Sequence, residues 1–484
     1  MRECICHCEA RSERSGAQSN CAPKQSHTRR IHTTRCSGNS AQDLGIHGSN
    51  FLVIELNKYD AIIFPMKLYN TQSRALENFE PQNQTVRLYV CGITPYDTTH
   101  LGHAATYCAF DVLIRYLESR GATVSYAQNV TDIDDDTIRE APKRGTNWKD
   151  LGNYWTAHFM RDMIALNVRP PNHYPRATET IAEIIEFDKT LIEKGFAYES
   201  GGSVYFHVDA YEKFGQLSHI PREEMLAIAN ERGNFPDDPK KRAPLDFVLW
   251  QAQAPGEPAW DSPWGPGRPG WHIECSAMNY KTFGPTIDIH GGGADLVFPH
   301  HECEIAQTVN FTGEEYFARI WMHAAMVGYE GEKMSKSLGN LVMVSDLLKT
   351  YTPDAIRLFL AKHHYRFPWE FMHAELDASR AQCTQLTQAA QAMGGDGNAM
   401  DFQYAREHFE NALDNDLDSP RAAAVLCEFA ASLLEHADAR RDVRDAQTWF
   451  RRAASILGLR LDAFGPEAHV REGWERHLNR FPTE

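Results

Sequence analysis

The sequence lacks the features that would mark a membrane protein, a disulfide scaffold or a basic nucleic-acid binder. No apolar run approaches the about 20 residues that a membrane-spanning helix needs, and no signal-peptide pattern opens the chain. The 11 cysteines are scattered over 484 residues, so we expect reduced thiols in a cytoplasmic protein. A net charge of −16 argues against a generally basic nucleic-acid binder, although a local basic patch stays possible.

Residues 1–65 differ from the rest of the chain, because they are rich in Arg, Ser, Cys and His and show no helical or strand periodicity. One alternative is a metal site, built from Cys4, Cys6, His7 and Cys8, but no distant second cysteine pair supports it. Another is an organelle transit peptide, which the early glutamates oppose. We expect a disordered or over-extended start, with the fold beginning near Met66.

The periodicity further along the chain predicts a parallel α/β sheet. Residues 85–90, TVRLYV, read as a buried strand that ends in a polar loop containing Cys91. Apolar residues at helical spacing over 110–117 predict a helix that ends at Gly121, and residues 123–130 predict the next strand. Ligands bind beyond the carboxyl ends of the strands in such sheets, so Cys91 falls where a site is expected.

The motif HLGH resembles the first signature of class I aminoacyl-tRNA synthetases. It places Gly102 between His100 and His103 at the start of a predicted helix. A glycine there lets ATP phosphates approach backbone N–H groups, and the two imidazoles stabilise charge at the α-phosphate. Alone, the motif could be an ordinary histidine pair.

GEKMSKSLGN, residues 331–340, resembles the second signature of the same class. The resemblance implies a mobile loop whose Lys333 and Lys336 reach the triphosphate and neutralise charge on the departing pyrophosphate. A solvated basic loop is the alternative. Together the two motifs predict activation of a carboxylate as an acyl-adenylate, with ATP and Mg²⁺.

Cys91 has three interpretations: a core cysteine, a redox thiol, or one ligand of a metal site completed from far along the chain. Cys275 stands in PGWHIECSAM, and His300 and Glu304 stand in GGGADLVFPHHECEIAQ. The four-residue spacing of His300 and Glu304 puts both side chains on one face of a helix. Two thiolates, an imidazole and a carboxylate form a donor set that suits Zn²⁺, so we favour the metal site.

The whole motif set resembles the cysteinyl-tRNA synthetases and the related mycothiol-pathway ligases, from about residue 66 to residue 369. The motifs stand in family order: YVCG, HLGH, NVTDIDD, PGWHIECSAM, GGGADLVFPHHECEIAQ and KMSKSLGN. The resemblance implies that one Zn²⁺ is held by Cys91, Cys275, His300 and Glu304, and that the thiolate of L-cysteine joins it. It also implies a cysteine pocket lined by Thr94, Thr131 and Trp271, and an ATP site formed by His100, Gly102, His103, Gly291, Gly292, Gly293, Asp295, Lys333 and Lys336.

Two acceptors fit this resemblance: the amine of glucosaminyl-inositol, or the terminal ribose of tRNA(Cys). CGITPYD at position 91 and the surroundings of residues 225–250 and 323–348 resemble the ligases, whereas Glu304 and WHIECSAM resemble the tRNA enzymes. Residues 373–484 carry 12 Arg, no Lys and 19 Asp plus Glu, which makes a poor clamp for phosphates. We find no further anticodon-binding domain and favour the amine acceptor by a small margin.

The expected architecture is an α/β protein with a Rossmann-like catalytic domain and an α-helical C-terminal domain. The predicted organisation is a catalytic domain over 66–345 with an inserted segment at about 170–265, a junction over 346–372 and helices over 373–484. In the last part, Ser419 is the predicted N-cap of a helix with Pro420 at its first position. We expect a monomer. A non-catalytic relative that binds tRNA or a protein is the alternative, and the intact motifs argue against it.

Overall fold

The computed structural model describes residues 66–81, 84–334, 339–461 and 465–481. The predicted N-terminal extension, residues 1–65, and the signature residue Lys336 lie outside them. The described residues belong to one compact unit. Among them, no helix combines the length and the apolar character needed to cross a membrane.

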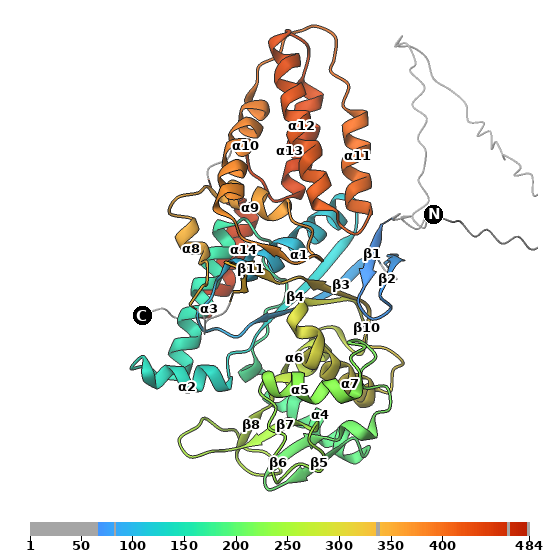
Figure 1. The fold of residues 1–484 in the computed structure, drawn as a ribbon, viewed down its shortest axis with the longest axis vertical. Helices are drawn as coiled ribbons and strands as arrows, with labels where there is room; N and C mark the ends of the chain where they lie inside the picture. Colours follow the sequence, from blue (N-terminus) through green and yellow to red (C-terminus); the bar gives the residue numbers. More distant parts are fainter. Residues whose placement is uncertain (1–65, 82–83, 335–338, 462–464, 482–484) are drawn as a thin grey trace, which may run out of the picture. The chain divides into compact units, whose positions relative to one another are not determined.

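A four-stranded parallel sheet lies at the centre of the molecule (Figure 1). Its strand order is β10-β9-β3-β4, and the strands are β3 (Thr85–Ile93), β4 (Thr123–Val130), β9 (Ile287–Gly293) and β10 (Ala318–Ala324). Helix α1 (Leu101–Ser119) connects β3 to its parallel neighbour β4, which confirms the predicted strand, helix and strand. The predicted polar loop at Cys91 is wrong, because β3 continues through Cys91 to Ile93 with an irregular register after Val90.

Helices cover the sheet and position the ends of its strands. The buried face of α1 includes Phe110, Leu113, Ile114 and Leu117, as the helical spacing predicts. Further helices are α2 (Asp135–Lys143), α3 (Trp148–Ala165), α6 (Trp271–Phe283) and α7 (Glu302–Thr312), and a short π-helical turn, Val297–His301, leads directly into α7. Helices α6 and α7 pack against each other.

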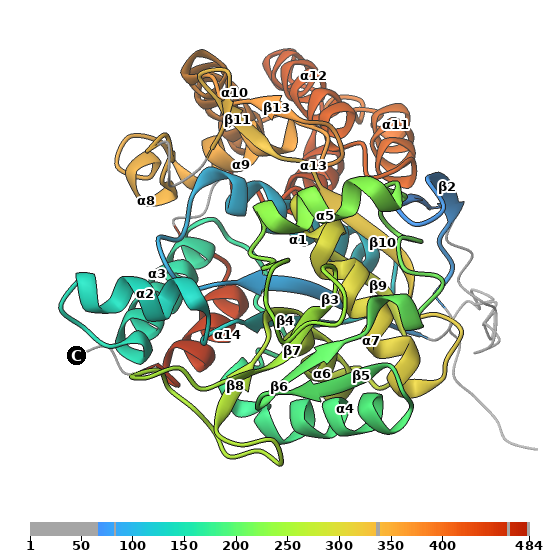
Figure 2. The same cartoon turned by 60° about the horizontal axis from the view of Figure 1, so that its bottom comes forward.

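A second, antiparallel sheet with the order β5-β6-β7-β8 lies between β4 and β9 in the sequence, and Figure 2 brings it forward. Its strands are β5 (Ala197–Ser200), β6 (Ser203–Phe206), β7 (Phe247–Ala252) and β8 (Gly267–Pro269). Helices α4 (Ile181–Glu193) and α5 (Arg222–Glu231) accompany it, with 3₁₀ turns at Ala177–Glu179, Val208–Ala210 and Ala294–Leu296. We propose that these elements form the inserted segment, with the exception of β8 and the 3₁₀ turn at Ala294–Leu296.

Short strands and helices flank the segment that carries the second signature. The strands β11 (Val327–Tyr329), β12 (Glu332–Lys333) and β13 (Trp369–Glu370) form a small sheet, and β1 (Lys67–Asn70) pairs with β2 (Ala75–Asn78). Helices α8 (Val344–Leu347) and α9 (Pro353–Ala361) follow β12.

The C-terminal part is helical, as the sequence predicts, and its helices α10 to α13 lie side by side (Figure 1). The helices are α10 (His373–Gln391), α11 (Gln403–Asp414), α12 (Ser419–Asp438), α13 (Arg444–Ile456) and α14 (Ala468–Leu478). The predicted N-cap is wrong by one residue. Asp418 precedes α12 and accepts a hydrogen bond from the backbone N–H of Arg421, so Ser419 is already helical.

A buried ion-pair network joins α1 to α9 and to the end of α13. Arg357 donates to Asp111 at 2.6 Å and to the carbonyl of Leu457 at 2.8 Å, and Arg115 donates to Asp111 at 2.9 Å. A Cβ on Gly458 would lie 1.9 Å from the Arg357 guanidinium, so the close approach requires glycine. The network holds the helix that follows HLGH against the helical part of the chain.

Candidate active site and metal centre

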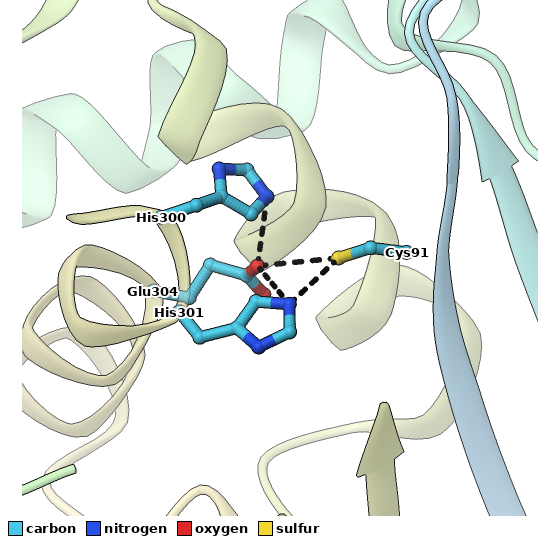
Figure 3. A group of neighbouring side chains, drawn as sticks. All are labelled: Cys91, His300, His301 and Glu304. Carbon is cyan, nitrogen blue, oxygen red and sulfur yellow. Dashed lines mark hydrogen bonds and ion pairs between the residues drawn. The ribbon is translucent and has the colours of Figure 1, made fainter. Parts of the chain in front are cut away.

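Donor side chains from two segments that are far apart in the sequence converge near the end of β3 (Figure 3). Cys91 projects from β3, while His300, His301 and Glu304 come from the π-helical turn and the first turn of α7. The Sγ of Cys91 lies 3.4 Å from Oε1 of Glu304 and 3.3 Å from Nε2 of His301, and Nε2 of His300 lies 3.0 Å from the same oxygen. These four donors all lie within 4.8 Å of one another.

Cys275 reaches the same cluster from α6. Its Sγ lies 3.8 Å from that of Cys91, and it also forms a hydrogen bond with His300. All the predicted ligands therefore meet although they are far apart in the sequence. His301 is an additional candidate donor that sequence reasoning missed.

The donor set suits a zinc ion in its chemistry, and three of its donor separations can be compared with those of a tetrahedral site. Tetrahedral bonds to sulfur, nitrogen and oxygen place neighbouring donors about 3.3–3.8 Å apart. The separations of 3.8 Å, 3.4 Å and 3.0 Å around Cys91, Glu304 and His300 are close to that range. Each of these side chains is also buried, which keeps competing water away from the donors.

Charge pairing inside the cluster shifts the pKa values of Cys275 and His300 in the direction opposite to the effect of burial. Burial disfavours the thiolate of Cys275, yet its hydrogen bond with Cys91 and the nearby His300 lower its pKa to about 6. Burial likewise opposes ionisation of His300, but Glu304 and Cys275 raise its pKa to about 10. Burial raises the pKa of Cys91 well above its ordinary value, and contact with Cys275 adds to the effect. The cluster thus holds protons that an incoming metal ion would displace.

Further histidines hold the cluster in place. His290 on β9 lies 2.9 Å from Oε2 of Glu304, and His301 lies 2.7 Å from His323 on β10. His323 in turn lies 2.8 Å from the hydroxyl of Thr71. Burial lowers the pKa of His301 well below its ordinary value, and the neighbouring His290 adds to this, so its imidazole is neutral.

All three predicted pocket residues lie next to the cluster or to the strand that carries Cys91. Trp271 begins α6 and stacks on His300, with ring centroids 4.4 Å apart. Thr131 follows β4, and its N–H donates to the carbonyl of Ile93 at the end of β3. Thr94 follows Ile93 directly and is partly buried.

Glu274 lies on α6 next to Cys275 and is fully buried. Burial raises the pKa of its carboxyl group well above the ordinary value, and the nearby Thr131 hydroxyl acts in the opposite direction. No motif singled out this residue.

The HLGH turn is fixed to the segment that follows the second signature. The N–H of Leu101 donates to the carbonyl of Val342, and the N–H of Val344 donates to the carbonyl of Thr99. His100 precedes α1, and its ring centroid lies 3.7 Å from that of His103. The backbone at Val342 and Val344, just after the second signature, therefore lies beside the HLGH turn at the start of α1.

Gly102 and the glycines at the end of β9 all stand where space is limited. A Cβ on Gly102 would lie 3.0 Å from the His100 ring, one on Gly291 2.2 Å from Phe110, and one on Gly292 2.9 Å from Leu296. At Gly291 the Phe110 ring thus already requires glycine, whereas at Gly292 a Cβ would require the Leu296 side chain to shift. Gly293 ends β9, Asp295 lies in the 3₁₀ turn that follows, and the backbone of Lys333 ends β12.

Comparison with known proteins identifies the family. The family described as tRNA synthetases class I (C) catalytic domain matches residues 78–381. A cysteine–tRNA ligase of Dehalococcoides mccartyi is 44% identical over 401 residues, which cover 82% of this chain and 86% of the relative. The chain belongs to the cysteinyl-tRNA synthetase family.

A second kind of relative within this family carries a different name. The L-cysteine:1D-myo-inositol 2-amino-2-deoxy-alpha-D-glucopyranoside ligase of Thermobispora bispora is 45% identical over 382 residues, covering 79% of this chain and 93% of the relative. The relatives of both kinds are ligases, and this member of the family is an enzyme of the same class.

Solved structures support the fold. Methionyl-tRNA synthetase of Mycobacterium tuberculosis, solved with methionyl-adenylate, superposes with a TM-score of 0.56 at 14% identity and covers 77% of this chain and 88% of that chain. A leucyl-tRNA synthetase of Agrobacterium radiobacter gives 0.55 at 12% identity, covering 83% and 86%. This member of the cysteinyl-tRNA synthetase family therefore has the class I synthetase fold.

Proposed function

We propose that this protein uses ATP to activate L-cysteine as cysteinyl-adenylate. The observation that supports this most is the buried meeting of Cys91, Cys275, His300 and Glu304 at the end of β3, the strand that leads to the HLGH turn. A zinc ion bound there supplies a soft Lewis acid that prefers a thiolate to the harder hydroxyl of serine. The metal centre would thus select cysteine.

The chain's own residues carry out the remaining tasks in this proposal. Trp271, stacked on His300, forms a wall of the pocket for the cysteine side chain, with Thr94 and Thr131 beside the ends of β3 and β4. The HLGH histidines and the lysines of the second signature bind the phosphates of ATP, which is bound as its Mg²⁺ complex. The glycines of β9 and Asp295 hold adenine and ribose. Charge that develops on the phosphates is then met by preorganised donors.

For the acceptor we propose the amine of glucosaminyl-inositol. Residues 373–484 contain 12 Arg, no Lys and 19 Asp plus Glu, an acidic balance that repels a polyphosphate backbone. An amine acceptor needs no such contact. The CGITPYD motif supports the same acceptor.

Transfer of cysteine to tRNA(Cys) is the second candidate, and Glu304 favours it. Its carboxylate is fully buried within hydrogen-bond distance of His290 and His300, as the tRNA-enzyme resemblance implies for a zinc ligand. The cysteine–tRNA ligases among the relatives support this candidate.

Release of AMP by the full chain tests both candidates. The reaction would contain ATP, Mg²⁺ and cysteine, with glucosaminyl-inositol in one series and total tRNA in another. Stimulation by the amino sugar alone is the expected result, and stimulation by tRNA alone would replace the amine proposal. A Cys275→Ala variant serves as control for metal-dependent activation, and the absence of cysteine-dependent AMP release in every series would contradict the whole proposal.

A further inference from the structure

Glu274 is a fully buried acid whose two carboxylate oxygens have no hydrogen-bond partner of good geometry among the described residues. Buried charges in proteins are normally paired, because removing an unpaired carboxylate from water is costly. The Glu274 carboxyl group is therefore either permanently protonated or paired with a cationic group of a bound ligand.

The location of Glu274 favours a ligand. Trp271, Glu274 and Cys275 stand at positions i, i+3 and i+4 of α6, so the three side chains share one face of the helix. This face carries the tryptophan that stacks on His300 and one of the clustered thiols. The Thr131 hydroxyl lies beside the Glu274 carboxyl group, and α6 packs on β4, which ends next to Thr131.

The neighbouring acids already have partners. Asp132 accepts hydrogen bonds from Arg176 at 2.8 Å and from the hydroxyl of Thr178 at 2.6 Å. Asp134 caps α2 by accepting from the N–H of Asp136. Among the described residues, Glu274 is thus the acid of this group whose carboxylate oxygens lack a hydrogen-bond partner, and the adjacent carboxylates make its surroundings attractive to a cation.

We propose that Glu274 binds the α-ammonium group of the amino-acid substrate while the metal centre binds its thiol. This inference rests on the proposed function and adds a second point of recognition to it. A metal that selects thiolates does not distinguish cysteine from other small thiols. A carboxylate at a fixed position beside the metal centre can distinguish them, because it stabilises only a bound thiol that carries a cationic group at the matching distance.

A thiol-binding titration tests the proposal without relying on turnover. The full chain is loaded with Co²⁺, and the increase in thiolate-to-cobalt absorption above that of Cys91 and Cys275 is followed during titration with L-cysteine or with 3-mercaptopropionate, which lacks the ammonium group. The wild-type protein should bind cysteine at least tenfold more tightly. Glu274→Gln should weaken cysteine binding by about 10- to 100-fold, the effect of losing a charge-assisted hydrogen bond, and leave 3-mercaptopropionate unchanged.

Asp188→Asn is a matched control, because Asp188 on α4 is also fully buried and neither of its carboxylate oxygens has a hydrogen-bond partner within the described part of the chain. It should leave both titrations unchanged. Cysteine affinity unaltered by Glu274→Gln, or a loss shared equally by both thiols, would overturn the assignment. So would equal binding of the two thiols to the wild-type protein, a measurement that needs no variant. If neither thiol increases the absorption above that of the cobalt-loaded protein, the metal–thiol contact of the proposed function fails as well.

Discussion

Replacing Glu304 by Gln removes one negative charge from the centre of the proposed zinc site. Its carboxylate lies 2.9 Å from His290, 3.0 Å from His300 and 3.4 Å from the Sγ of Cys91. Loss of a residue that only supports a metal ligand typically lowers metal affinity 10- to 100-fold. A direct donor should matter at least as much, so we expect zinc affinity to fall by about 100-fold or more, or about 2.7 kcal/mol.

Glu302→Gln provides the matched control, because Glu302 lies on the same helix and is equally buried. Its carboxylate accepts hydrogen bonds from the backbone N–H groups of Gly215, Leu217 and Ser218 instead of facing the donors. This variant should lower the free energy of unfolding by about 1.5–3 kcal/mol and leave zinc affinity near that of the wild type.

Competition with a chromogenic chelator measures zinc affinity, and chemical denaturation in excess chelator measures the stability of the metal-free chain. The expected pattern is opposite in the two variants: Glu304→Gln loses affinity and Glu302→Gln loses stability. One zinc ion bound by Glu304→Gln with wild-type affinity would refute the inclusion of Glu304 in the site. Equal loss of affinity in both variants would show that general disruption of α7 explains the result.

Three further predictions concern the site and the fold. Zinc affinity should rise with pH, because the metal-free site holds protons on Cys91 and on His300, whose pKa is about 10, and zinc binding releases them. Calorimetry in buffers of different ionisation enthalpy counts the released protons, and a zinc affinity that does not depend on pH would contradict the assignment of these residues as zinc ligands. Cys275→Ala should abolish both zinc binding and cysteine activation, and unchanged metal content by elemental analysis would remove Cys275 from the ligand set. Arg357→Met should cost about 1.5–3 kcal/mol of unfolding free energy, since it removes one of the two arginine partners of the buried Asp111 carboxylate and leaves Arg115. The exposed Arg380→Met is its control, and equal denaturation midpoints would refute the buried network.

Much of the candidate site could be predicted from the sequence, because the motifs carry donor types that few other functions need. Cys91 and Cys275 stand far apart in the chain, yet the parallel topology brings β3 and α6 together, and their thiols meet. The four-residue spacing of His300 and Glu304 likewise gave their contact directly. The roles assigned to these residues stay predictions until metal binding is measured.

Other features depend on tertiary structure and could not be read from local patterns. The extent of β3 past Cys91 follows from its pairing with β4, which an apolar run alone does not reveal. The cap of α12 is Asp418 because its backbone leaves the helical region one residue earlier than composition indicates. The double histidine of FPHHE was a usable signal for His301, whereas the isolation of the Glu274 carboxyl group becomes visible only in three dimensions.

The central claim is that this protein activates cysteine through the signature segments and the metal centre. Exchange of labelled pyrophosphate into ATP by the zinc-loaded full chain tests it most directly, because this reaction requires adenylate formation and no acceptor. We predict exchange that depends on L-cysteine, is absent with L-serine, and is lost in the Cys275→Ala variant. Exchange that proceeds equally with serine, or that needs no amino acid, would contradict the claim.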